Sequence, residues 1–274
     1  MSVRPPTPVT APASPQRPAD PDGFLWWAPI VAILAAIVAA NIVVLFLLGV
    51  GDLKGSRDTE LSPAGTLIAT YAQDAIMIAA AVLFARITVN AVRPATFGIV
   101  RPKVDKRLLV VPATFIAFWI VLQVFGHLID PGAKDDLPDE LGAKDTAAAM
   151  IAVAVLVCVI APIVEETMFR GFLFKALQRP LGWIWAAVVS GLVFGGIHAG
   201  SAPAVFLLPL AVFGFVLCVV YRKTGSLIPG MGMHALNNGI ALGGALDWSL
   251  AGTAAAAAIS PVVVVAIAWV VARE

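Results

Sequence analysis

The feature that most constrains this chain is a succession of apolar runs, each about long enough to cross a lipid bilayer as a helix. A spanning helix needs about 20 apolar residues, because it rises about 1.5 Å per residue. Of the 274 residues, 60% are hydrophobic and only 13% are charged, a balance outside the range of soluble domains. We therefore predict an all-α fold, a polytopic transmembrane helical bundle, with eight spans at residues 26–50, 64–86, 108–129, 147–169, 183–199, 203–221, 226–246 and 252–272.

Charges between the runs predict the orientation of the bundle. The connection between the second and third spans is the most cationic stretch of the chain, and cytosolic loops carry an excess of Lys and Arg. We expect this side to be cytosolic, and alternation of eight spans then places both termini there. The connection from Asp130 to Asp145, on the opposite side, is rich in acidic residues. We expect an integral protein of a bacterial inner membrane, in contact with lipid.

Three further features bound the domain organisation and the partners. Residues 1–23 hold seven prolines, and we predict a disordered cytosolic tail before one transmembrane domain at residues 24–274. The net charge of +1 gives no sign of nucleic-acid binding. Cys158 and Cys218 lie in apolar runs without neighbouring ligands, so we expect two buried thiols.

Ionisable residues inside an apolar run are the first indication of function, because each costs about 2.5–3.5 kcal/mol at the centre of a bilayer. The densest group is Glu165-Glu166-Thr-Met-Phe-Arg170, at the end of the fourth run. Glu166 and Arg170 lie four residues apart on a helix, so they share a face and can pair. Glu165 points about 100° away and is left to act as a general base. The alternative is that these charges only mark the cytosolic boundary of the membrane.

Two histidines lie in later runs, each four residues from another conspicuous side chain. The segments are Phe194-Gly-Gly-Ile-His198 and His234-Ala-Leu-Asn-Asn238, and a spacing of four places both residues on one helical face. Taken singly, each histidine could make an interhelical hydrogen bond and nothing more. Depth favours a shared site, because Glu165 and His198 lie at similar distances on either side of the turn near Pro180. We predict that the three segments meet in one buried layer.

Such a cluster suits hydrolysis. A carboxylate and two imidazoles can deprotonate a water, either directly or on a bound metal, and the Asn238 amide can donate a hydrogen bond to an oxyanion. A metal, if one is bound, would be zinc held by Glu165, His198 and His234. Peptide hydrolysis fits better than phosphoryl transfer, because the sequence has neither a Gly-rich phosphate loop nor an Asp cluster for magnesium. The sequence also lacks the HExxH motif of many zinc proteases.

Together the three segments resemble the CPBP family of CAAX prenyl endopeptidases and bacteriocin-processing enzymes, also called the abortive-infection family. Its pattern is EExxxR, then FxxxH, then HxxxN or HxxxD, and the resemblance covers about residues 147–245. It implies an intramembrane endopeptidase that cuts a prenylated or membrane-associated peptide near the cytosolic face. It also implies an eight-helix core with a cavity that faces the cytosol.

The resemblance also implies a role for each residue of the pattern. Those matching Glu165 and His198 would activate the water, and those matching His234 and Asn238 would hold the oxyanion or a metal. The pair that matches Glu166 and Arg170 would support them. Members of the family have been described both as zinc enzymes and as metal-free glutamate proteases, so both mechanisms stay open at this point.

Two other classes of function are compatible with the sequence. One is a non-catalytic membrane protein of the same fold that gives immunity to a bacteriocin or scaffolds a partner. The other is an ion- or proton-coupled transporter, for which buried Glu, Arg and His are equally suitable. Further polar residues in the first two spans, Asn41, Gln73 and Asp74, are expected to form interhelical hydrogen bonds and to take no part in chemistry.

Overall fold

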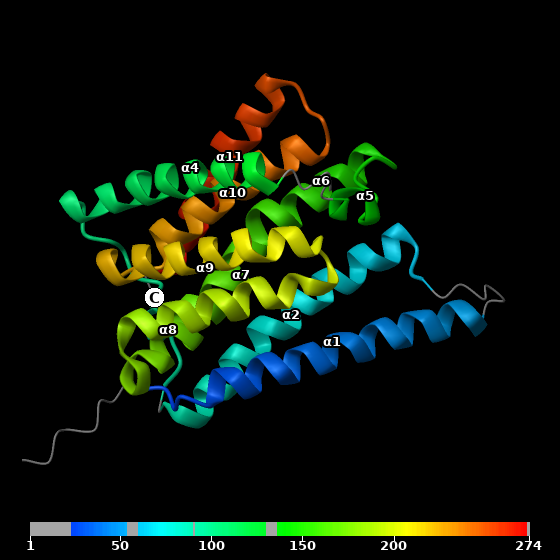
Figure 1. The fold of residues 1–274 in the computed structure, drawn as a ribbon. Helices are drawn as coiled ribbons and strands as arrows, with labels where there is room; N and C mark the ends of the chain where they lie inside the picture. The colour runs from blue at the N-terminus through cyan, green and yellow to red at the C-terminus, as the bar shows by residue number, and fades with distance from the viewer. Residues whose placement is uncertain (1–22, 54–59, 90, 130–135, 273–274) are drawn as a thin grey trace, which may run out of the picture.

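The computed structural model describes residues 23–53, 60–89, 91–129 and 136–272, and within these ranges the chain is helical without any β-strand (Figure 1). This confirms the predicted all-α fold. The predicted disordered tail, residues 1–23, lies outside the described residues except for Gly23. The elements, with η2 and η3 π-helical and η1 and η4 3-10 helical, are α1 (Ala28–Leu53), α2 (Pro63–Thr88), α3 (Pro94–Phe97), η1 (Lys106–Leu109), α4 (Val110–Ile129), α5 (Leu137–Glu140), α6 (Ala147–Val155), η2 (Leu156–Ile160), α7 (Ala161–Glu165), η3 (Glu166–Phe174), α8 (Lys175–Ile197), η4 (His198–Gly200), α9 (Ala204–Thr224), α10 (Ile228–Ala245) and α11 (Leu250–Val271).

Six helical stretches among the described residues are long and apolar enough to cross a membrane, where the sequence predicts eight spans. One reason is that the fourth and fifth predicted spans form a single stretch, Ala147–Gly200. This stretch turns back at Gly182, whose φ of 73° is left-handed, and its two arms then pack together: the Ser190 hydroxyl donates to the Phe169 carbonyl at 3.2 Å. The other reason is α10, which is helical over the seventh predicted span but is less apolar because of its glycines, histidine and asparagines.

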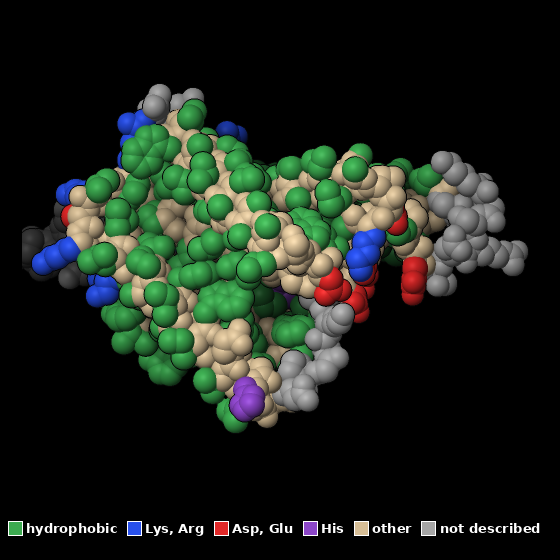
Figure 2. Space-filling model, turned by 90° about the horizontal axis from the view of Figure 1, so that it is seen from above, with side chains coloured by type: hydrophobic (Ala, Val, Ile, Leu, Met, Phe, Trp, Pro, Cys, Tyr) green, Lys and Arg blue, Asp and Glu red, His purple; other side chains and the backbone are tan. Residues whose placement is uncertain are grey.

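The outside of the bundle is apolar and part of its inside is charged, the reverse of a soluble protein. Hydrophobic side chains cover much of the face in Figure 2. Leu45 on α1, Ile120 on α4 and Val262 on α11 are 68%, 59% and 68% exposed, whereas Arg170 and Glu166 are fully buried. Apolar surface on this scale is covered by lipid in an integral membrane protein.

Charged side chains separate toward opposite ends of the bundle (Figure 2). One end, called here the basic end, holds the residues that the sequence places on the cytosolic side: Arg86, Arg93, Arg101, Lys103, Lys106, Arg107, Lys175, Arg179, Arg222 and Lys223. The two ends of the described chain also lie there, since Phe24 packs on Phe97 and Trp269 packs under the Arg101 guanidinium. The other end, called here the acidic end, carries Asp136, Asp139, Glu140, Lys144, Asp145 and Asp247.

Small residues let helices α8 and α9 approach closely. A Cβ atom added to Gly195 would come within 2.5 Å of the Leu207 carbonyl oxygen, and one added to Gly191 within 2.6 Å of the Ala211 carbonyl oxygen. Transmembrane helices commonly use such a small-xxx-small spacing to bring their backbones together. Of the two glycines that precede His198, Gly195 makes such a close approach. Gly196 faces open space instead.

Polar side chains at the acidic end fix where three helices begin. The hydroxyls of Ser62, Thr146 and Ser249 accept hydrogen bonds from backbone N–H groups three residues on, at the starts of α2, α6 and α11. Each bond satisfies one of the donors that a helix leaves unpaired at its N-terminus. These caps hold the first turns of the three helices.

Candidate active site

The site lies where the fourth span departs from regular α-helix. The π-helical stretches η2 and η3 lie on either side of α7, and π-helical insertions are frequent at functional sites. Side chains from other helices bond carbonyl groups inside both stretches. The Asn238 amide on α10 donates to Val157 in η2 at 2.9 Å, and Ser190 on α8 bonds Phe169 in η3. The EExxxR segment is therefore held by two other helices.

Glu166 and Arg170 form the predicted ion pair. The distance from Arg170 Nη1 to Glu166 Oε1 is 2.9 Å, and both side chains have zero exposure. The guanidinium also donates from Nη2 to the Gly214 carbonyl on α9 at 3.0 Å, and it lies over the Phe194 ring at 4.4 Å. Because a buried charge needs a partner of opposite charge, the pair can persist at this depth. Gly230 on α10 leaves room for it, since a Cβ there would meet Glu166 Oε2 at 3.2 Å.

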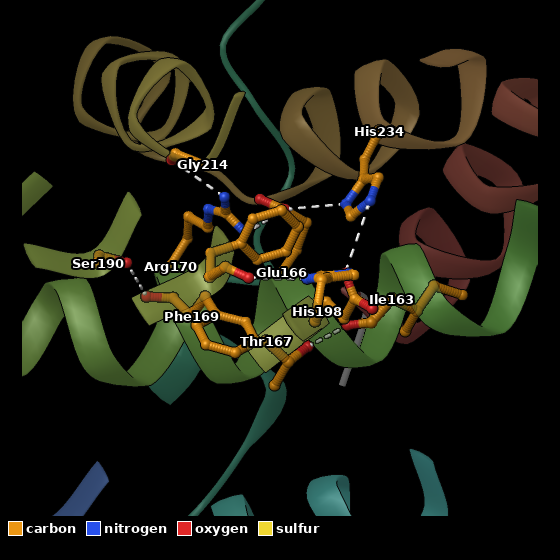
Figure 3. Close-up of polar contacts among 11 residues, drawn as sticks. Ile163, Glu166, Thr167, Phe169, Arg170, Ser190, His198, Gly214 and His234 are labelled. Carbon is orange, nitrogen blue, oxygen red and sulfur yellow. Dashed lines mark hydrogen bonds and ion pairs between the residues drawn. The ribbon is translucent and has the colours of Figure 1, made fainter. Parts of the chain in front are cut away.

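His234 joins this pair from α10 (Figure 3). Its Nδ1 lies 3.2 Å from Glu166 Oε1, and its Nε2 lies 3.7 Å from Glu165 Oε2. The Glu166 oxygen that pairs with Arg170 is a hydrogen-bond acceptor, so Nδ1 of His234 can donate to it. This contact orients the ring, with Nε2 directed toward Glu165.

Phe194 explains why an aromatic residue precedes His198 by four. Its ring lies 5.0 Å from the His198 ring, 5.8 Å from the His234 ring and under the Arg170 guanidinium. It therefore contacts a residue of each motif and fixes their spacing. Phe194 is only 1% exposed, so it acts through packing and has no access to solvent.

The stretch Ala147–Gly200, which turns back at Gly182, is a helical hairpin, and His198 lies at the end of its second arm. The His198 ring is oriented by its own helix. Nδ1 lies 2.7 Å from the Phe194 carbonyl oxygen, which can only accept a hydrogen bond. In the neutral ring Nδ1 therefore carries the proton and Nε2 has a free lone pair. Such a nitrogen can take a proton from a water molecule or bind a metal.

Glu165, His198 and Asn238 line one cavity of about 530 Å³ between α1, α2, the hairpin and α10. The Glu165 side chain is 12% exposed, in contrast to its neighbour Glu166. The structure thus brings all six predicted site residues together in two ways. Glu165, Glu166, Arg170 and His234 form one chain of contacts, and Glu165, His198 and Asn238 share the cavity.

Three polar residues that the sequence suggested as interhelical bonds also line this cavity: Asn41, Gln73 and Asp74. Asp74 is 4% exposed, and its Oδ2 has no hydrogen-bond partner among the described residues. Among the described residues, the Asn41 amide donates to the Ile37 carbonyl of its own helix. A sequence signal for α2 exists, because the lining residues Thr70, Gln73, Asp74 and Met77 follow the spacing of one helical face.

A catalytic zinc ion is typically held by three protein ligands. Two imidazoles and a carboxylate suit zinc chemically. Within the described part of the chain, however, no three His, Cys, Asp or Glu side chains gather in a way that could hold an ion. Glu165, His198 and His234 as placed in the described structure do not form a metal site.

The part of the chain that carries this site resembles a known protein family. Residues 147–240 match the family model described as type II CAAX prenyl endopeptidase Rce1-like. This segment is similar to the Rce1-like family. The match contains all three motifs and nearly coincides with the range of the predicted resemblance, which it confirms. The Rce1-like segment contributes the hairpin, α9 and most of α10, whereas α1, α2 and α4 precede it.

Two relatives from Bacillus subtilis (strain 168) show distant similarity. The protein described as "Putative membrane peptidase YdiL" is 27% identical over 94 residues, which cover 34% of this chain and 37% of that protein. "Uncharacterized protein YyaK" is 31% identical over 134 residues, which cover 45% and 44% of the two chains. The chain thus matches less than half the length of these relatives. No solved structure matches it significantly.

Proposed function

We propose that the chain is a membrane peptidase that hydrolyses a peptide bond in a prenylated or otherwise membrane-associated substrate. The proposal rests on a difference in contacts between two adjacent carboxylates. Glu166 is engaged by Arg170 and His234, whereas Glu165 faces a cavity that it shares with His198. A carboxylate without a cationic partner, in the same cavity as an imidazole with a free nitrogen, suits the activation of a water molecule.

In the proposed reaction Glu165, assisted by His198, takes a proton from a water molecule in the cavity. The water oxygen bonds the carbonyl carbon of the substrate, and the negative charge that develops on the carbonyl oxygen is met by N–H donors. Asn238 can supply one, because its amide nitrogen has two N–H bonds and Val157 accepts only one of them. As the C–N bond breaks, the proton passes from Glu165 to the leaving nitrogen.

An apolar cavity on the other side of α10 supports a substrate with a hydrophobic group. It encloses about 350 Å³ between α4, α9 and α10, and its walls include Phe118, Trp119, Phe206 and Phe213. The Phe213 ring also packs against His234 at 5.4 Å. An isoprenoid or acyl chain held there would be separated from His234 by the Phe213 ring. The peptide attached to such a chain could then reach the site.

The proposal predicts that Glu165→Gln loses hydrolysis of a lipid-modified peptide by about 10²- to 10⁴-fold, the usual contribution of a general base. His198→Ala should lose activity on the same scale. The exposed residues Glu60 and His127 supply matched controls, since Glu60→Gln and His127→Ala change the same residue types at positions that do not line the cavity. Products are measured by mass spectrometry with protein purified in detergent. Full activity in Glu165→Gln would overturn the proposal, and a flux of ions or protons lost in this variant without any hydrolysis would replace it with transport.

Metal content requires its own measurement. Zinc is quantified in the purified protein, and hydrolysis is assayed with and without a chelator. Activity that survives removal of all metal would assign water activation to Glu165 and His198 alone. A stoichiometric zinc ion that is lost in His198→Ala would instead show that the donors rearrange to bind it.

A further inference from the structure

The polar cavity leads toward the acidic end of the bundle. Besides the site residues, its lining includes Leu137 and Leu141 at α5 and Gly200 and Ser201 in the connection between α8 and α9. Both connections lie at the acidic end, and α5 carries Asp139 and Glu140. Gly200 and Ser201 are exposed although they line the cavity, so the cavity reaches the surface beside them.

At the basic end the same space is closed by packed aromatic rings. Phe24, Phe97 and Phe172 contact one another with ring centroids 4.6 to 6.0 Å apart, and each is no more than 7% exposed. Phe172 lies one turn beyond Phe169, which forms part of the cavity wall. The backbone is equally tight here, because a Cβ on Gly171 would approach the Phe97 carbonyl oxygen to 2.7 Å.

Lys175 contacts this cluster of three phenylalanines at the basic end. Lys175 Nζ donates to the Thr96 carbonyl at 2.8 Å and lies 5.5 Å from the centre of the Phe24 ring. The segment with Thr96 and Phe97 follows α2 and holds several of the cations that define the basic end. The closed side of the cavity is thus the side that the excess of Lys and Arg predicts to be cytosolic.

We infer that the site is entered from the non-cytosolic side of the membrane. The charge distribution predicts that the basic end is cytosolic, whereas the family resemblance implies a cavity that faces the cytosol. These two expectations disagree in this molecule, because the cavity opens at the acidic end. We retain the orientation that the charges predict. Resting on the proposed function, the inference names the substrate class: a peptide segment of an exported or membrane-anchored protein whose cleaved bond lies on the non-cytosolic side.

Cysteine labelling tests the direction of access without requiring activity. The parent chain has two cysteines, both buried and therefore a low background. Ser201→Cys places a thiol at the mouth, and Gly196→Cys places one deeper in the cavity, where an added Cβ meets nothing within 4 Å. Val104→Cys, at a position 85% exposed at the basic end, is the matched control.

Spheroplasts that express each variant are treated with a membrane-impermeant maleimide, before and after permeabilisation. We expect Ser201→Cys to react fully in intact spheroplasts, Gly196→Cys to react more slowly from the same side, and Val104→Cys to react only after permeabilisation. Labelling of Ser201→Cys only after permeabilisation, or of Val104→Cys in intact spheroplasts, would overturn the inference.

A second experiment distinguishes failure of this inference from failure of the proposed function. An impermeant fluorogenic peptide is added to spheroplasts and to inverted vesicles, and cleavage is expected with spheroplasts alone. Cleavage by inverted vesicles alone would overturn the inference. If neither preparation cleaves any peptide while Ser201→Cys is still labelled from outside, the proposed hydrolysis fails and the direction of access stands.

Discussion

The site has two halves that differ in how they treat charge. The sealed half consists of Glu166, Arg170, His234 and Phe194, all buried and bonded or stacked to one another. The open half consists of Glu165, His198, Asn238 and Asp74 around the polar cavity. In the sealed half each charge meets a partner of the opposite sign. In the open half a carboxylate faces space that a substrate can fill.

The difference shows how one helix can serve structure and chemistry with adjacent residues. Glu165 and Glu166 differ by about 100° around the helix, which is enough to direct one toward Arg170 and the other toward the cavity. The buried pair is costly to assemble and costly to break, since removal of one partner leaves a charge without compensation. We therefore expect substitutions in the sealed half to act on folding first and those in the open half to act on hydrolysis first.

The strongest test of this contrast is Arg170→Met. The substitution leaves the Glu166 carboxylate buried beside His234 without its guanidinium, and breaking a buried pair in this way costs about 3–5 kcal/mol. We expect a large fall in the thermal unfolding temperature, measured in detergent, together with loss of folded protein. Glu165→Gln, one position from the pair, should unfold at nearly the parent temperature while hydrolysis is lost.

Two controls make this comparison specific. The double variant Glu166→Gln with Arg170→Met removes both charges and should recover part of the stability that Arg170→Met loses. Lys144→Met breaks the ion pair with Asp139, whose side chains are 57% and 42% exposed, and should leave unfolding unchanged. Equal destabilisation by Arg170→Met and Lys144→Met would show that burial of the pair contributes nothing.

Much of the sealed half could be predicted from local spacing. The distance of four residues between Glu166 and Arg170 already requires a shared helical face, and the structure shows the pair at 2.9 Å. The meeting of Glu165 and His198 in one cavity followed from their equal distances from the turn. What spacing could not show is that Glu166 also orients His234, because that contact joins residues 68 positions apart.

The open half was harder to foresee because part of its wall comes from other helices. Gln73 and Asp74 look like ordinary interhelical polar residues until α2 is placed against the hairpin. The span count was inexact for a related reason: α10 carries the polar residues of the site, so it falls short of the apolarity expected of a spanning helix. The closed basic end depends on three phenylalanines that no sequence spacing links.

Adjacent glycines offer a test of intermediate size, because one packs against α9 and the other lines the open half. Gly195 packs against α9, and Gly195→Ala would force a Cβ to within 2.5 Å of the Leu207 carbonyl oxygen. We expect a loss of about 1–3 kcal/mol in stability, typical of overpacking. Gly196 lines the cavity with open space around it, so Gly196→Ala should keep or raise stability, by up to about 1 kcal/mol of helix propensity. Unfolding in detergent compares the two, and equal losses would contradict the division at this point.

The smallest and most discriminating comparison uses Ser190 and Asn238, which bond carbonyl groups in the two π-helical stretches. Ser190→Ala and Asn238→Ala each remove one such bond, so both should lose about 0.5–1.5 kcal/mol of stability. Only Asn238 lines the cavity, and loss of an oxyanion donor slows hydrolysis by about 10²- to 10³-fold. We therefore expect similar unfolding temperatures but a fall in turnover for Asn238→Ala alone. If the two variants match in turnover as well, Asn238 belongs with Ser190 as a support of the π-helical backbone and does not supply the oxyanion donor.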